Sequence, residues 1–260
     1  MTVYFLSDFG STDVFAGVVR AVLARRAPGV RLVDLAHDLP PGDLRHAALQ
    51  LYTAVPHLAE GGVVLAVVDP GVGSERRALA VRSERLWYVL PDNGLLTLAA
   101  ELDPPREAWT LEPGRYTAGP VSPTFHGRDV FAPAAAHLAL GLPPAALGSR
   151  LDVAELVRLP LATVAGREGE VIAFDRFGNA ISNLRPQEPP EAVHLAGRRI
   201  PFRATFADVP EGEAVAYLGS SGLVEVAIRG GSLREQWRLY EGAAVSLHGP
   251  EEEPPPLELD

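Results

Sequence analysis

The residues best suited to chemistry occur in three short segments that lie far apart in the chain. Residues 123–133 place a histidine, an arginine and an aspartate around a glycine, directly before an Ala-rich run of helical character. Residues 68–76 and 174–179 have a similar mixture of aspartate, arginine and glycine. Titratable side chains at such junctions favour a functional site over a core. We therefore expect one small-molecule site assembled from distant parts of the chain.

Two aspartates follow the ends of expected strands. Asp8 ends the first strand and Asp69 ends the third, while Asp13 stands at the start of the next helix. Ligands of open α/β sheets bind outside the carboxyl ends of the strands, so Asp8 and Asp69 would both face that crevice. Taken singly, Asp8 and Asp13 are explained equally well as turn and helix-cap residues. The parallel positions of the two strand-end aspartates favour a site.

The glycine turn at residues 71–73 is a weak signal by itself. It does not continue into the pattern Gly-x-x-x-x-Gly-Lys, which argues against a phosphate-binding loop. Either it only redirects the chain, or it brings Arg76 back toward Asp69. His126 is flanked by Arg128 and Asp129, and an Asp–Arg–His cluster could tune a water molecule or hold an incoming nucleophile, although a lone histidine is more often structural.

Other polar residues also have a structural and a functional interpretation. Arg128 and Asp129 favour the structural one, in which they pair with each other or cap a helix. The stretch 175–179 could bind a nucleoside, with an aspartate for an amine, an aromatic ring for the base and an asparagine for amide-like hydrogen bonds, or could be a polar strand turn. The loop 219–222 could offer N–H and hydroxyl groups to a carboxylate, or be only a hairpin.

The bulk properties exclude several classes of protein. The 260 residues carry a net charge of -10, which argues against a nucleic-acid binder because phosphate backbones need a basic face. The absence of cysteine excludes disulfides, a thiolate nucleophile and a cysteine zinc site. Residues 1–8 have no basic leader and predict a first strand, and no apolar run approaches the ~18 residues of a membrane helix. These features predict a cytoplasmic protein.

The apolar periodicity predicts an open α/β sheet with crossover helices in the first part of the chain. Strands are expected at 3–6, 30–35 and 63–68, and helices at 14–23 and 44–55. Residues 11–13 stand where the first helix needs a cap, and Asp43 leads the second. The expected elements that follow are strands at 78–81 and 86–90, a turn at 91–94, and a helix at 131–140 with Pro133 in its first turn.

From about residue 165 the texture changes to short strand-like pieces separated by Gly-, Pro- and Asp-rich turns. They lie at 170–174, 192–195, 198–202, 214–218, 223–228 and 243–247. This pattern is typical of a small β-barrel or sandwich. We therefore predict an α/β domain at 1–160, a smaller all-β, barrel-like domain at 166–250 and a flexible acidic tail at 251–260.

Taken together, the fragments resemble the SAM hydroxide adenosyltransferase family of S-adenosyl-L-methionine (SAM) hydrolases, which is related to the fluorinase and chlorinase enzymes. The match spans nearly the whole chain, and its short motifs are specific as a set. They are 7–10 with Asp13, 68–73 with Arg76, 91–94, 124–129, 175–179 and 220–222.

The resemblance implies attack of water or hydroxide on C5′ of the ribose, giving adenosine and L-methionine. It also implies a homotrimer with the ligand between neighbouring subunits, and neither a metal nor a cofactor. The positions that match residues positioning the nucleophile are Asp69, Arg76 and His126.

The resemblance further implies a set of substrate contacts. Asp8 matches the contact to the ribose hydroxyls, and Asp13 and Asp175 match positions near the methionine amine. Phe125 belongs to the same substrate-binding set. The remaining contacts are to adenine and to the methionine carboxylate, and the matching positions are Phe177, Asn179 and Ser220. Ser221 departs from the arginine of the halide-forming branch.

Three other functions remain open from the sequence. A halide-using enzyme is the rival within the family, although an acidic residue and a histidine suit water better than a halide. A metal-dependent nucleoside or phosphate hydrolase could bind a hard cation through Asp8, Asp13, Asp69 and Asp129. A SAM or adenosine sensor would keep the binding residues with negligible turnover, because catalysis depends on finer placement than binding does.

Overall fold

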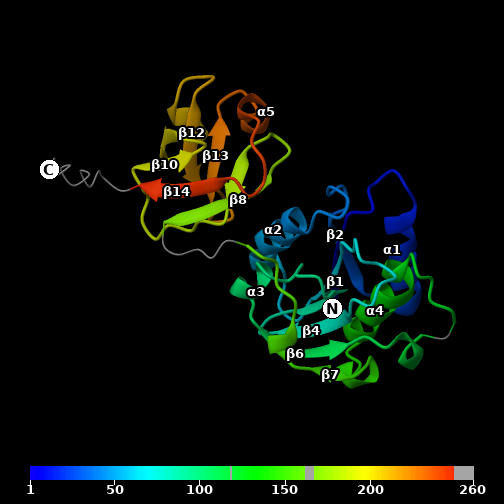
Figure 1. Cartoon of the computed structure of the whole chain (residues 1–260). Helices are drawn as coiled ribbons and strands as arrows, with labels where there is room; N and C mark the ends of the chain where they lie inside the picture. Colours follow the sequence, from blue (N-terminus) through cyan, green and yellow to red (C-terminus); the bar gives the residue numbers. More distant parts are fainter. Residues whose placement is uncertain (118, 162–166, 249–260) are drawn as a thin grey trace. The chain divides into compact units, whose positions relative to one another are not determined.

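The computed structural model describes residues 1–117, 119–161 and 167–248, and the chain divides into two compact units, Met1–Leu159 and Pro160–Asp260 (Figure 1). The predicted acidic tail, 251–260, lies outside the described residues. No helix among the described residues has the length and apolarity needed to cross a bilayer.

The first unit is built on a mixed seven-stranded sheet. Its strand order is β2-β1-β3-β5-β4-β6-β7. Four adjacent strands run parallel: β2 (Arg31–Ala36), β1 (Thr2–Ser7), β3 (Val63–Val67) and β5 (Trp87–Pro91). The central strand β3 is buried along its whole length, as expected for a parallel strand covered on both faces.

The other edge of this sheet is antiparallel, which the sequence pattern did not predict. β4 (Ala78–Ser83) pairs antiparallel with both β5 and β6 (Pro105–Thr110), and β6 pairs with the two-residue β7 (Arg150–Leu151). β6 was not predicted, because it begins at a proline and carries charged residues. The direction of β4 is not encoded locally, since its apolar run looks the same in either orientation.

Helices cover both faces of the sheet, which confirms the predicted α/β architecture. α1 (Phe15–Arg26) and α4 (Ala132–Ala139) share a core with Val3 and Phe5 of β1. α2 (Leu44–Ala54) and α3 (Ala99–Leu102) pack on the opposite face, with Tyr4 and Leu6. Consecutive residues of β1 thus point to opposite layers. Figure 1 shows the two helix pairs on either side of the strands.

The helix ends agree with the sequence at two places and differ at one. Asp43 caps α2 by accepting a hydrogen bond from the His46 N–H at 2.9 Å, and Pro133 lies in the first turn of α4, both as predicted. The expected cap of α1 at residues 11–13 is wrong. The N-cap is Val14, which makes no side-chain cap bond, and the Ser11 N–H donates instead to Asp38 at 2.8 Å.

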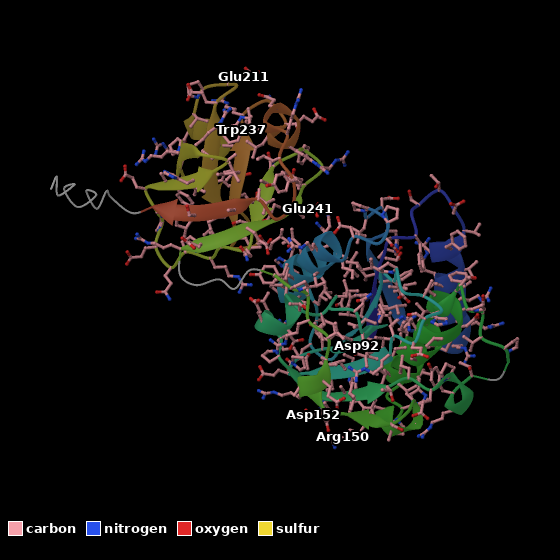
Figure 2. The ribbon with its side chains drawn as sticks, in the orientation of Figure 1. Asp92, Arg150, Asp152, Glu211, Trp237 and Glu241 are labelled. Carbon is pink, nitrogen blue, oxygen red and sulfur yellow. The ribbon has the colours of Figure 1, made fainter. Side chains whose placement is uncertain are left out.

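Short helical turns complete the connections of this unit. They are η1 (Val55–His57), η2 (Pro113–Arg115), η3 (Gly127–Phe131), η4 (Pro144–Ala146) and η5 (Val153–Glu155). The buried carboxylate of Asp92, after β5, lies inside the unit (Figure 2). It accepts from Arg77 Nε at 2.7 Å and from the Val157 N–H at 2.9 Å, and so ties the start of β4 to the segment after η5.

The second unit is a nearly closed antiparallel sheet, in agreement with the predicted barrel-like domain. Its strands, in the order β11-β10-β14-β8-β9-β13-β12, are β8 (Glu168–Phe174), β9 (Ala180–Ser182), β10 (Ala192–Leu195), β11 (Arg198–Pro201), β12 (Ala214–Leu218), β13 (Val224–Ile228) and β14 (Ala244–His248). A bridge between Phe202 and Ala216 joins the two outer strands. The turn η6 (Phe206–Asp208) and the helix α5 (Leu233–Trp237) lie between strands.

Candidate active site

The carboxyl ends of two neighbouring parallel strands bring the first site residues to one edge of the sheet. β1 and β3 pair in register, with Ser7 opposite Val67. Asp8 directly follows β1 and Asp69 follows β3 by two residues, so both lie where α/β sheets bind ligands.

The turn after Asp69 returns Arg76 to its carboxylate. The Val72 N–H donates to the Asp69 carbonyl at 3.1 Å and closes the turn. Arg76 Nε then donates to both carboxylate oxygens of Asp69, at 2.9 and 3.1 Å, and its Nη2 donates to Oδ2. Only 11% of the Arg76 side chain and 6% of the Asp69 side chain are exposed. The glycine turn therefore does more than redirect the chain, because it builds a buried, multiply bonded ion pair.

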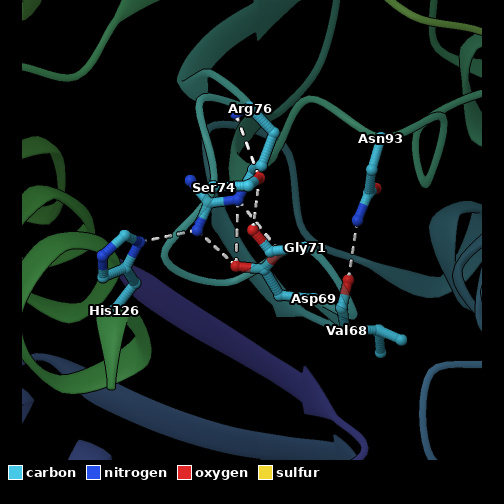
Figure 3. Close-up of polar contacts among 7 residues, drawn as sticks. All are labelled: Val68, Asp69, Gly71, Ser74, Arg76, Asn93 and His126. Atoms are coloured by element: carbon cyan, nitrogen blue, oxygen red, sulfur yellow. Dashed lines mark hydrogen bonds and ion pairs between the residues drawn. The ribbon is translucent and has the colours of Figure 1, made fainter. Parts of the chain in front are cut away.

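The same guanidinium also contacts His126. Figure 3 shows Arg76 between the aspartate and the imidazole, with Nη2 at 2.7 Å from His126 Nδ1. A guanidinium only donates, so Nδ1 accepts and the neutral ring carries its proton on Nε2. Burial, followed by the charge of Arg76, holds the pKa of His126 below its usual 6.5, although Asp69 and Asp129 act in the opposite direction. The imidazole is therefore neutral at pH 7.

Two glycines let the three segments approach this closely. A Cβ on Gly73, whose φ is +79°, would lie 2.6 Å from the Pro123 carbonyl oxygen, so the turn after β3 touches the segment that leads to His126. A Cβ on Gly127 would lie 2.9 Å from the ring of Phe9. Both distances are shorter than real Cβ contacts, so a larger residue would push the segments apart.

Two residues that support the site were not predicted as parts of it. Phe131 was missed, and Asn93 was noted only within the motif at residues 91–94. The ring of Phe131, fully buried, lies under the guanidinium of Arg76 at 5.3 Å. Asn93 Nδ2 donates to the Val68 carbonyl at 2.9 Å and fixes the residue before Asp69 (Figure 3). The π-helical turn η3, which His126 precedes, is the signal that could have drawn attention to Phe131, since such turns are frequent at functional sites.

Arg128 and Asp129 behave as the structural interpretation predicts. Arg128 donates to Asp129 from Nε and from Nη2, each at 2.7 Å, and Asp129 also accepts from the Ser122 N–H at 3.0 Å. Through the bond to Ser122, this ion pair fixes the segment that leads to His126. The adjacent Phe125 packs edge-on against Phe9 and Phe15, which are aromatic neighbours of the site.

The other predicted contacts of the first unit are more open. Asp8 Oδ2 accepts from the Gly42 N–H at 2.8 Å, while its Oδ1 has no hydrogen-bond partner among the described residues. Asp13 is exposed and makes no polar contact within the described part of the chain. A free carboxylate oxygen is available for ligand hydroxyl groups at Asp8, and an exposed carboxylate is available for a cation at Asp13.

The predicted contacts of the second unit lie in two hairpin turns. Asp175 Oδ1 accepts from the N–H groups of Phe177 and Asn179, both at 2.9 Å, and Oδ2 accepts from Asn179 Nδ2 at 2.8 Å. The ring of Phe177 projects into solvent, with 69% of the residue exposed. Ser220 and Ser221 occupy the turn between β12 and β13. Both segments are turns between strands, and the first also presents an aromatic ring that is largely exposed, with the guanidinium of Arg176 over it at 5.8 Å.

The carboxylates that a metal site would need are dispersed or already bonded. Asp69 accepts hydrogen bonds from Arg76, Asp129 accepts from Arg128, and one oxygen of Asp8 accepts from the Gly42 N–H. Across residues 1–117, 119–161 and 167–248, no three His, Asp or Glu side chains gather as metal ligands do.

Comparison with known proteins decides the family. Residues 3–148 match the SAM hydroxide adenosyltransferase N-terminal domain, and residues 169–246 match the C-terminal domain. The chain belongs to the SAM hydroxide adenosyltransferase family. The predicted resemblance is thus confirmed, and the first of these domains contains the Asp69–Arg76–His126 cluster.

Several relatives of this member of the SAM hydroxide adenosyltransferase family are named as hydrolases. A protein of Thermus thermophilus called (R)-S-adenosyl-L-methionine hydrolase is 60% identical over 252 residues, covering 94% of this chain and 98% of the relative. One of the same name from Salinispora tropica is 43% identical, covering 87% and 90%. Fluorinases are more distant, with that of Actinopolyspora mzabensis 27% identical over 94% of this chain and 95% of the fluorinase.

The fold is also that of a solved structure. A conserved hypothetical protein from Thermus thermophilus has a TM-score of 0.85 and 58% identity, covering 95% of this chain and 99% of that chain.

Proposed function

We propose that this chain hydrolyses SAM to adenosine and L-methionine by attack of water on C5′ of the ribose. A bond forms between the water oxygen and C5′ while the bond between C5′ and sulfur breaks. The electron pair of that bond stays on sulfur, which changes from a sulfonium to a neutral thioether, and the water gives one proton to solvent. Because the leaving group is neutral, no acid is needed to protonate it.

The observation that carries this proposal is the single guanidinium held between Asp69 and His126. Arg76 Nη1 and His126 Nε2–H have no hydrogen-bond partner among the described residues, so both can donate to the oxygen of a bound water, hold it in line with C5′ and stabilise the hydroxide character that it gains as its proton leaves. The carboxylate of Asp69 has lone pairs left to accept from the O–H of the same water. Water needs this help because it is a poor nucleophile until it is aligned and partly deprotonated.

The same arrangement favours water over a halide as the nucleophile. A halide arrives as an anion and accepts hydrogen bonds but donates none. The carboxylate of Asp69 would repel it, whereas it would attract the O–H of water. We therefore propose hydrolysis, although the fluorinases are relatives.

We assign the substrate contacts as part of this proposal. Asp8 holds the ribose hydroxyls, Asp13 and Asp175 face the methionine amine, and Phe125 belongs to the same substrate-binding set. Phe177 and Asn179 contact adenine, and Ser220 contacts the methionine carboxylate. Ser221, next to it, also belongs to the substrate-binding set. The exposed ring of Phe177 supports this assignment, because a largely exposed aromatic side chain suits stacking on a base. We further propose a cytoplasmic homotrimer with sites at its subunit interfaces, working without a metal or cofactor.

The test is incubation of the purified full-length protein with SAM, with adenosine and methionine followed by chromatography and mass spectrometry. Both sulfonium epimers are supplied separately, since the curated relatives are named for the (R) form. In ¹⁸O-labelled water, attack at C5′ places the label on the 5′ oxygen of adenosine. Parallel reactions contain chloride or EDTA, and light scattering gives the mass in solution.

We expect labelled adenosine and methionine in equal amounts, with no effect of EDTA. Formation of 5′-chloro-5′-deoxyadenosine instead of adenosine would indicate the halide reaction, and loss of activity with EDTA would indicate a metal hydrolase. Tight binding of SAM without product would indicate a sensor. A mass other than three chains would remove the trimer but leave the hydrolase.

A further inference from the structure

A series of hydrogen bonds that runs inward from the surface ends directly beside Asp8, and the reaction proposed above does not use it. Ser7 Oγ is 2.7 Å from His37 Nδ1, and His37 Nε2 is 2.9 Å from Asp34 Oδ1. Arg20 Nη1 donates to the other oxygen of Asp34 at 2.5 Å. The series joins α1, β2 and the end of β1, and it runs from the half-exposed Arg20 and Asp34 inward to Ser7, which is 0% exposed.

The arrangement has the composition of a Ser–His–Asp triad but not its function. Ser7 has no access to solvent, so its hydroxyl cannot reach an electrophile. The imidazole uses Nδ1 for the serine and Nε2 for the aspartate, which reverses the roles that the two nitrogens have in serine hydrolases. The three residues therefore have a structural role and do not form a nucleophilic triad.

The protonation states follow from the partners. Burial raises the pKa of Asp34, but hydrogen bonds from His37 and Arg20 outweigh it and keep the pKa below its usual value, so the carboxylate is charged and accepts only. His37 Nε2 therefore carries a proton, and Nδ1 accepts from the Ser7 hydroxyl when it carries none. Ser7 Oγ in turn lies 3.4 Å from the Phe9 N–H, a long contact across the position of Asp8.

The segment that contains His37 also forms hydrogen bonds with the rest of the loop at residues 7–11. The His37 carbonyl accepts from the Gly10 N–H at 2.8 Å, and Asp38 Oδ1 accepts from the Ser11 N–H at 2.8 Å. Beyond it, the Gly42 N–H donates to Asp8 Oδ2 at 2.8 Å. The hydrogen bonds between segment 37–42 and this loop thus constrain either the backbone around Asp8 or the Asp8 carboxylate.

We propose that the series Arg20–Asp34–His37–Ser7 is a positioning device that holds the loop 7–11 so that Asp8 presents its free Oδ1 to the ribose hydroxyls. This rests on the contact that we assigned to Asp8 under the proposed function. His37, Ser7 and Asp34 act through Asp8 and touch no ligand. The Ser7–His37 bond is the critical one, because it is the buried link next to Asp8, whereas Arg20 and Asp34 are half-exposed and only orient the imidazole.

The test measures coupling between the protein and the ligand hydroxyls, by calorimetric titration of adenosine and of 2′,3′-dideoxyadenosine. Ser7→Ala should weaken adenosine binding roughly 10-fold, since one hydrogen-bonded link is lost. It should weaken binding of the dideoxy ligand, which has no hydroxyls for Asp8, by less than about 2-fold. A loss that is equal for the two ligands would mean that Ser7 only supports the fold, and would overturn the proposal.

Ser83→Ala is the matched control. Ser83 is also a buried strand serine of the same sheet, but its hydroxyl bonds to the Leu86 carbonyl and to Asp103. Its replacement should lower the unfolding temperature by a similar amount and leave both affinities unchanged. If it reproduced the ligand-dependent loss of Ser7→Ala, that loss would not belong to the loop at Asp8.

Two substitutions of His37 cover the case in which Ser7→Ala does not fold. His37→Asn keeps a polar atom at the position of Nδ1 and should keep most of the discrimination between the two ligands. His37→Gln moves the polar atoms to the position of Nε2 and should lose it. The reverse order would overturn the assignment of the Ser7–His37 bond. These titrations need no turnover, so wild-type protein that discriminates the ligands but does not hydrolyse SAM would contradict the proposed reaction and leave this inference intact.

Discussion

Arg76 donates from Nη2 to Nδ1 of His126 at 2.7 Å, and this bond sets the proton on the far nitrogen of the imidazole. Because the guanidinium cannot accept, His126 cannot reverse the bond without turning its ring. The histidine is therefore prepared as a neutral donor through Nε2, and not as a base at that atom. Within the proposed cluster, Asp69 is the group that accepts from the attacking water.

Replacing His126 tests this arrangement most directly. His126→Ala should reduce kcat for SAM hydrolysis by roughly 10²–10³-fold, the range typical of the loss of one preorganised hydrogen-bond donor, with little change in KM. His137→Ala, in α4 of the same helical run, is the matched control and should keep the wild-type kcat. Steady-state kinetics with adenosine as the readout decides; full activity of His126→Ala would remove the residue from the mechanism.

A conservative change at Arg76 should separate charge from geometry. Lysine keeps the positive charge but cannot donate from a rigid fork to a carboxylate and an imidazole at once, so Arg76→Lys should lower kcat at least ~10-fold. The neighbouring Arg77→Lys breaks the fork to Asp92 and Glu155 and should affect only the unfolding temperature. Equal kcat values for the two variants would show that charge alone suffices at position 76.

The lowered pKa of His126 predicts how stability depends on pH. The unfolded chain takes up a proton at this residue near pH 6.5, whereas the folded protein takes it up only at lower pH. Between these two pKa values the unfolded state binds more protons, so the free energy of unfolding falls as the pH falls. His126→Asn removes this titration, and its stability curve from urea denaturation should be flatter below pH 6.5 and parallel to wild type above it.

The same shift predicts the acid limb of the rate profile. The neutral imidazole is the competent form, so kcat/KM should hold at pH 6.5 and decline only below it. A decline that begins above pH 6.5 would mean that another group controls the limb.

The close approach of Gly73 to Pro123 can be tested with a matched pair of glycines. Gly73→Ala adds a Cβ that would lie 2.6 Å from the Pro123 carbonyl oxygen, which should destabilise the protein by about 1–3 kcal/mol and lower kcat by separating Arg76 from His126. Gly29 has a similar φ, +86° against +79°, but no atom within 4 Å of the added Cβ. Gly29→Ala should therefore show the backbone strain alone, without loss of kcat.

The exposed ring of Phe177 predicts an effect on binding without an effect on folding. Phe177→Ala should raise KM for SAM roughly 5-fold or more, because a stacking surface for adenine is lost, and should leave the unfolding temperature within about 1 °C. Tyr240→Ala removes a ring that is equally exposed, 70% against 69%, and should change neither. If KM is unaffected by Phe177→Ala, the assignment of adenine to this turn is wrong.

Much of the fold could be predicted because its signals are local. The apolar run of β3 and the periodicity of α2, with Asp43 at its cap, each contain their own evidence. The antiparallel edge could not be predicted, since the orientation of β4 depends on its neighbours β5 and β6 and not on its own residues. The predicted cap of α1 was wrong because the helix begins at Phe15, so that Val14 and not a residue of 11–13 is the N-cap.

The sequence by itself determined the family, the two kinds of domain and the residue types of the Asp–Arg–His cluster, because short motifs are fixed by chemistry wherever they fold. The tertiary structure decided which of these residues touch: one guanidinium bonds both Asp69 and His126, while Arg128 is held by Asp129. It also revealed His37 beside Ser7, thirty positions apart. Hydrogen bonds require atoms within about 3 Å, and only strand pairing and glycine turns set such distances between remote segments.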